Sequence, residues 1–105
     1  MTSPTARAKQ KLESEGWKVW LVEQTIRTPR MTFKRDLFNA FDLLCVREGV
    51  TKAIQVTTLS NLGARIKKLA ENEYMADLRK AGWAMEAWGW RKLKTGWEAK
   101  VVDVS

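Results

Sequence analysis

Histidine is absent from this 105-residue sequence, and cysteine occurs only once. Without histidine the chain lacks the commonest general base and the commonest zinc ligand. A Ser–His–Asp triad, a zinc finger and a histidine-based metal site are therefore excluded. The single cysteine excludes an internal disulfide. Cys45 lies within the apolar run Phe41–Val46, which predicts a buried and unreactive thiol.

Long apolar runs are also missing. No stretch approaches the roughly 20 apolar residues that a membrane helix needs, and the N-terminal MTSPTARAKQ lacks the apolar centre of a secretory signal. We therefore expect no membrane contact and a location inside the cell, in the cytoplasm. The hydrophobic content of 45% and the chain length predict one compact domain, residues 1–105, with a real core.

Positive charge is abundant, with a net charge of +7 and a pI near 9.9. This balance favours an anionic partner, of which nucleic acid is the commonest. The cations gather in three places: four on a stretch without acids (Arg27, Arg30, Lys34, Arg35), three after the central strand (Arg65, Lys67, Lys68) and three near the C-terminus (Arg91, Lys92, Lys94). Each group is either a phosphate-binding surface or merely a solvated face.

The order of elements predicts the fold class. Ser3 and Pro4 are typical of a helix start, and Gly16 of the position just past a helix end. Further elements follow from apolar periodicity and turn residues: a strand Trp17–Val22, a polar connection Gln24–Lys34 broken by Pro29, an apolar segment Leu37–Val46, a turn Arg47–Thr51, a strand Lys52–Thr57, a helix Leu62–Ala81 capped by Asn61 and ended by Gly82, and strands Ala84–Trp90 and Trp97–Val104. This order, α, β, β, β, α, β, β, predicts an α/β domain with a central mixed sheet flanked by helices.

Three polar residues interrupt these apolar strands. Asp42 lies in Phe41–Val46, and Gln55 and Thr57 lie in the next strand. The turn between the two strands predicts a hairpin, and residues two apart share one strand face. Asp42, the Gln55 side chain and the backbone carbonyl of Val56 would then form the hard-oxygen site that Mg²⁺ prefers. The alternative is that these polar side chains lie on a solvent-facing surface.

This pattern resembles the PD-(D/E)xK nuclease superfamily, and within it the enzymes similar to Holliday-junction resolvases. Phe41-Asp42 matches the proline–aspartate element, Gln55-Val56-Thr57 falls at the acid-x-lysine, and the similarity covers roughly Thr5–Trp97. It implies an αβββαβ restriction-endonuclease-like core and an endonuclease dependent on Mg²⁺ (or Mn²⁺) that hydrolyses branched or structured DNA. It also implies a homodimer, which suits a two-fold symmetric junction, and a host such as a prokaryotic or phage-infected cell.

The resemblance assigns roles to residues, with three departures. Asp42 would be the principal metal ligand, Gln55 and the Val56 carbonyl further ligands, and Thr57 would orient the attacking water. Glutamine stands in place of the acid, threonine in place of the lysine, and the first helix has no acid before Glu13. Asp36 or Glu23 could supply the missing negative charge, and Lys34, Arg65 or Lys68 the missing positive charge. The alternative for Asp36, a turn residue that pairs with Arg35 or Lys34, is favoured over a metal ligand.

Two other classes of function stay open. A nuclease-fold protein could bind DNA or RNA without cutting it. Gln55 and Thr57, in place of the motif acid and lysine, would distinguish such a protein from an active enzyme. An assembly module could use the six tryptophans as its interface. Trp88, Trp90 and Trp97 could stack on unpaired bases, or they could fill the core or a dimer interface.

Overall fold

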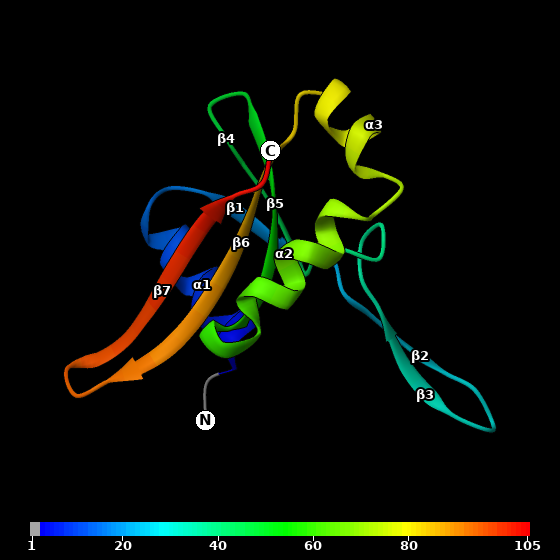
Figure 1. Ribbon diagram of the computed structural model, residues 1–105, viewed down its shortest axis with the longest axis horizontal. Coiled ribbons are helices and arrows are strands. Elements are labelled where there is room, and N and C mark those ends of the chain that lie inside the picture. Colours follow the sequence, from blue (N-terminus) through cyan, green and yellow to red (C-terminus); the bar gives the residue numbers. More distant parts are fainter. Residues whose placement is uncertain (1–2) are drawn as a thin grey trace.

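The structure, a computed structural model, describes residues 3–105, apart from the side chains of Phe33 and Lys34. Its centre is a five-stranded sheet in the order β1-β4-β5-β6-β7 (Figure 1). The strands are β1 (Lys18–Leu21), β4 (Leu43–Arg47), β5 (Val50–Thr58), β6 (Ala84–Leu93) and β7 (Gly96–Asp103). Neighbouring strands are antiparallel except β5 and β6, which are parallel. The α/β prediction with a mixed sheet and flanking helices is therefore confirmed.

Helices cover both faces of the sheet. Helix α1 (Pro4–Ser14) packs Ala8 and Leu12 on one face, and its predicted start is confirmed because the Ser3 hydroxyl accepts a hydrogen bond from the Ala6 amide at 3.1 Å. On the other face lie the 3₁₀ turn η1 (Leu59–Asn61), α2 (Leu62–Ala70) and α3 (Met75–Lys80). These three form the crossover that two parallel strands require. None of the helices in residues 3–105 is long and apolar enough to cross a bilayer.

The single helix predicted from Leu62 to Ala81 is wrong. The chain leaves the helix after Ala70 because Asn72 makes competing hydrogen bonds. Its side-chain oxygen accepts from the Tyr74 amide at 2.8 Å, and its side-chain nitrogen donates to the Phe38 carbonyl at 3.0 Å. Asn61 precedes α2 as predicted but makes no side-chain capping bond.

The connection predicted over Gln24–Lys34 is also wrong, because this segment is a β-hairpin. Strands β2 (Gln24–Arg27) and β3 (Thr32–Arg35) pair with each other in a separate two-stranded sheet that projects from the body (Figure 1). Thr28 closes the turn, since its hydroxyl and its amide both donate to the Met31 carbonyl, at 2.9 and 2.8 Å. Pro29 falls inside this turn and therefore does not interrupt pairing.

The apolar segment Leu37–Val46 is a strand only in its second half. Phe38 and Asn39 have φ angles of 53° and 56°, which no strand accommodates. They form a tight turn closed by the bridge between Leu37 and Phe41, and β4 begins at Leu43. Asp36 and Asp42 are therefore not on one strand face, contrary to the even spacing that suggested it.

The tryptophans mainly fill the core. Trp17, Trp88 and Trp90 are buried with α1 against the sheet, so the prediction that Trp88 and Trp90 fill the core is confirmed and the alternative of base stacking is wrong for both. Trp97 is 46% exposed. Cys45 is buried, and burial raises the pKa of its thiol to about 11, which agrees with the inert role predicted for it.

Candidate functional site: an acidic cluster where three strand pairs meet

Three antiparallel pairs end at the same place. The β1–β4 pair continues through a hydrogen bond of 3.1 Å from the Val22 amide to the Asp42 carbonyl, so Glu23 follows directly beside Asp42. The β2–β3 pairing, extended by one residue, sets Glu23 opposite Asp36. The β4–β5 pairing, extended likewise, sets Asp42 opposite Gln55. Four polar side chains from distant parts of the chain are thus brought together by register alone.

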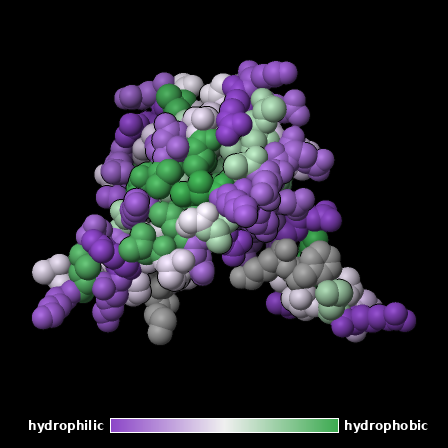
Figure 2. Space-filling view, in the orientation of Figure 1, coloured by the Kyte–Doolittle hydropathy of each residue, from purple (hydrophilic) through white to green (hydrophobic). Residues whose placement is uncertain are grey.

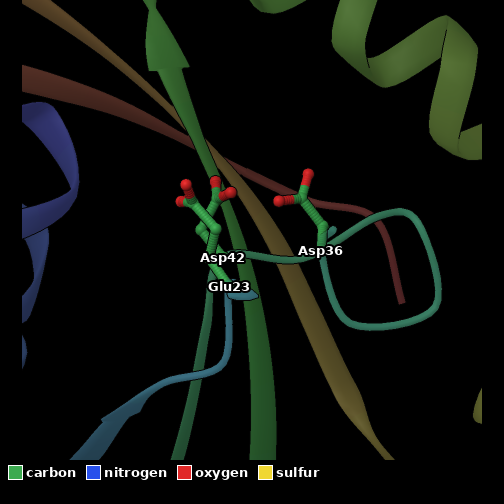
Figure 3. Close-up of side chains that lie close together, drawn as sticks. All are labelled: Glu23, Asp36 and Asp42. Atoms are coloured by element: carbon green, nitrogen blue, oxygen red, sulfur yellow. The ribbon is translucent and has the colours of Figure 1, made fainter. Parts of the chain in front are cut away.

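Glu23, Asp36 and Asp42 form the acidic cluster of this site. Each offers a carboxylate oxygen, and the three oxygens lie within 4.8 Å of one another. Figure 3 shows the Glu23 and Asp42 side chains side by side, with the Asp36 carboxylate turned toward them from the neighbouring loop. Asp42 is buried and the other two are half-buried. The cluster therefore concentrates negative charge at the edge of the core.

Asp42 is held in a defined position. Its Oδ2 accepts hydrogen bonds from the Val56 amide at 2.8 Å and from the Gln55 side-chain nitrogen at 3.2 Å. Burial, together with the charges of Asp36 and Glu23, raises the pKa of Asp42 to about 6, against the lowering effect of the Val56 hydrogen bond. The interpretation of Asp42 as an exposed surface acid is therefore wrong.

Two cations of α2 act electrostatically on this cluster. The pKa of Asp36 is raised, first by burial and then by the charge of Glu23, while Lys68 and Arg65 lower it. Arg65 also lowers the pKa of Asp42. Of the three cations expected to replace the motif lysine, Arg65 thus acts on two of the acids and Lys68 on one. The Lys34 side chain lies outside the described part of the structure.

The second strand of the predicted motif is only partly assembled around Asp42. The Gln55 side chain is buried and donates to both Asp42 and the Val56 carbonyl, the latter at 3.4 Å. Its nitrogen, not its oxygen, therefore faces the acid. Thr57 is buried two residues further on, and within residues 3–105 its hydroxyl makes no hydrogen bond to Asp42 or Gln55. Its assignment to orient a water stays a prediction.

Two cavities flank the cluster. One of about 380 Å³ lies between the start of α1 and the base of the β2–β3 hairpin, and Lys9, Glu23 and Thr25 are among its lining residues. The other, of about 400 Å³, is lined by Arg35, Asp36, Phe38, Asn39 and Tyr74. The acids therefore lie between two hollows that a polymeric substrate could occupy on either side.

The remaining predicted nucleic-acid contacts lie along the β2–β3 hairpin. Arg27 closes β2 and Arg30 lies in the hairpin turn, both exposed. Arg35 is the last residue of β3, directly before Asp36. The cations of this stretch therefore run from the tip of the hairpin to the edge of the cluster.

A divalent cation fits the cluster by the chemistry of its donors. The three carboxylates offer only oxygen, the donor that Mg²⁺ and Mn²⁺ prefer. Burial raises the pKa of Asp36 and of Asp42, and a divalent cation beside them would favour their ionised forms. Rotation of the Gln55 amide would exchange the positions of its nitrogen and its oxygen, and so add a fourth side-chain oxygen to the site. Which of the two atoms faces Asp42 is decided by the hydrogen bonds of the amide.

Sequence reasoning named Asp42, Gln55 and Val56 correctly as neighbours but left Asp36 and Glu23 as secondary options. A signal for both was present, since the tetrads QTIR and TFKR, each with residues that favour strands and each ending in arginine, flank the four-residue turn TPRM. A hairpin there brings residues 23 and 36 together.

Comparisons with known proteins add no family to this geometry: no protein-family model matches the chain, and no curated protein or solved structure matches it.

Proposed function

We propose that the protein is an endonuclease of the PD-(D/E)xK type, dependent on Mg²⁺ (or Mn²⁺), that hydrolyses structured or branched DNA. The observation that carries the proposal is the convergence of Glu23, Asp36 and Asp42 at one end of three strand pairs, with Arg65 beside them. The element order and the parallel β5–β6 pair are in keeping with a restriction-endonuclease-like core.

In this proposal the three carboxylates hold the metal, with the Val56 carbonyl and the rotated Gln55 amide as further donors. The metal, when bound, supplies an activated water and stabilises negative charge on the phosphate. Arg65 replaces the motif lysine as the fixed positive charge near the reacting phosphate. Glu23 replaces the acid that the first helix lacks, because it lines the cavity beside the start of α1. The β2–β3 hairpin and Lys68 bind backbone phosphates.

A homodimer in the cytoplasm of a prokaryotic or phage-infected cell belongs to the same proposal. Strand β1 lies at an edge of the sheet, and its Trp20 is 75% exposed beside the half-exposed Val46. An uncovered edge strand with apolar side chains is suited to pairing with a second copy. Analytical ultracentrifugation of the protein and of Trp20→Lys tests this part, which a monomeric parent protein would overturn.

Cleavage assays test the enzymatic part. Labelled four-way junction and linear duplex are incubated with Mg²⁺ or Mn²⁺ and the parent protein, Asp42→Asn, or Asp77→Asn as a charge-matched control on the exposed face of α3. We expect metal-dependent nicks with the parent and the control and none with Asp42→Asn. The ratio of the two substrates then shows whether branching matters.

The alternative of a DNA-binding protein that does not cut is favoured by one observation: the Gln55 nitrogen, rather than an acid, faces Asp42. Binding without cleavage by the parent protein would establish that alternative. The assembly-module alternative no longer has Trp88 available on the surface, since that residue is 2% exposed.

A further inference from the structure

The molecule has two projecting arms. The first arm is the β2–β3 hairpin, residues 24–35, and the second is the end of the β6–β7 hairpin, residues 91–98. Figure 1 places them at opposite ends of the longest axis, along which the Cα atoms extend over 40 Å. Figure 2 shows purple, hydrophilic side chains at the ends of both projections, with open space between them below the body of the molecule.

Both arms carry an excess of positive charge. The first arm has four cations and no acid, as noted above. The second has Arg91, Lys92 and Lys94 against one acid, Glu98, which is neutralised by Arg91 at 3.4 Å. Within the described part of the chain neither Lys92 nor Lys94 forms an ion pair, and both are exposed. Two lysines at the far end of the molecule from the first arm are thus available to an anion.

The second arm is braced against the body. Arg7 of α1 stacks on the ring of Trp97 at 4.3 Å and also lies over Trp90 at 5.9 Å. Trp97 pairs with Lys92 across the ladder. Because the cross-strand Arg91–Glu98 pair lies next to this stack, the tip is held in position rather than left as a free loop. Lysines on such a support lose less freedom on binding than lysines on a mobile segment.

We infer that residues 91–98 are a second nucleic-acid contact, and that the two arms hold one DNA duplex between them. The inference rests on the proposed function for the choice of DNA as the anion. A two-stranded β-ribbon is narrow enough to enter a major groove of about 12 Å, and both arms are such ribbons. The cavity with Glu23 in its lining lies between the start of α1 and the first arm, so a duplex held there has its backbone next to the acidic cluster.

Binding measured by fluorescence anisotropy tests this inference without requiring cleavage. A labelled 20-base-pair duplex is titrated in EDTA at several salt concentrations with the parent protein, Lys92→Gln/Lys94→Gln, and the control Lys11→Gln/Lys80→Gln. The control carries the same change of charge on exposed lysines outside both arms. Unfolding curves establish that all three proteins are folded.

We expect the tip variant to lower the slope of log K against log[salt] by about 1.8, because each lost phosphate contact removes about 0.9. Counter-ion release alone then weakens binding about 60-fold at 0.1 M salt. The control should keep the parent slope. A tip variant that behaves like the control would overturn the second contact, and equal affinity for a single strand of the same length would overturn the duplex.

The outcome is separable from that of the proposed function. A protein that binds duplex through both arms but never cleaves leaves the two-arm contact standing and removes the nuclease. Cleavage that depends on Asp42 but is unchanged in Lys92→Gln/Lys94→Gln leaves the nuclease standing and removes the two-arm contact.

Discussion

Replacement of Asp42 by asparagine should change the pH dependence of stability in a way that reports directly on the cluster. The pKa of Asp42 rises from 3.8 to about 6 on folding, mainly because of burial. Between these pH values the folded state holds a proton that the unfolded chain has released. The free energy of unfolding of the parent protein therefore falls as the pH rises from 4 to 6 and then levels off.

The size of the effect follows from the two pKa values. At about 1.4 kcal/mol for each pH unit between them, the ionised carboxylate destabilises the metal-free folded protein by about 3 kcal/mol at pH 8. Part of this is already present at pH 4, so the change between pH 4 and 8 is about 2.5 kcal/mol. Asparagine does not titrate and retains an oxygen to accept from the Val56 amide. Asp42→Asn should therefore gain about 2.5 kcal/mol relative to the parent over this range.

Urea unfolding in EDTA at pH 4, 5, 6, 7 and 8 measures this difference. The control Asp77→Asn alters an exposed acid, so its difference from the parent should stay flat. Addition of Mg²⁺ at pH 8 should stabilise the parent protein and the control but not Asp42→Asn, since a ligand stabilises only the state that binds it. A difference between Asp42→Asn and the parent that does not vary with pH would refute the burial of an ionisable group at this position.

Three further perturbations probe the surroundings of Asp42. Arg65→Gln should raise the pKa of Asp42 further and slow metal-dependent cleavage by about 10²–10³-fold; a pH–rate profile identical to that of the parent would exclude Arg65 from this role. Gln55→Glu should tighten Mg²⁺ binding in calorimetry, because it adds a charge to the donors opposite Asp42, and unchanged affinity would remove Gln55 from the ligand set. Gly89→Ala should destabilise the protein by about 1–3 kcal/mol in urea unfolding. The reason is that a Cβ at this position would lie 3.1 Å from both the Leu59 backbone and the Leu62 side chain. An unchanged unfolding midpoint would contradict this close approach of α2 to β6.

Much of the fold follows from short-range chemistry in the sequence. Ser3 and Pro4 specify the start of α1, and the strands of the central sheet coincide with segments rich in β-branched and aromatic residues. The break between α2 and α3 could not be predicted in the same way. It depends on Asn72 reaching the Phe38 carbonyl, 34 residues away, which helical periodicity does not report.

The residues of the site also differ in whether the sequence alone brings them together. Asp42 and Gln55 are 13 residues apart on one hairpin, so counting from the turn brings them together. Asp36 and Glu23 become neighbours of Asp42 only through the β2–β3 pairing, which the basic residues and Pro29 concealed. The environment of Asp42 also required the structure, because its burial depends on the packing of the whole sheet.

The two-residue turn at Glu48 and Gly49 has a consequence for how this chain could be altered. Arg47 pairs directly with Val50, and the turn residues have φ angles of +50° and +81°, as a type I′ turn requires. Every pairing along β4 and β5 is counted from this turn. One inserted residue would either be expelled as a bulge or carry the Asp42 side chain to the opposite face of the sheet. A loop grafted at this end of the hairpin must therefore keep the two-residue length of the turn, because that length determines the face of the sheet on which the Asp42 carboxylate lies.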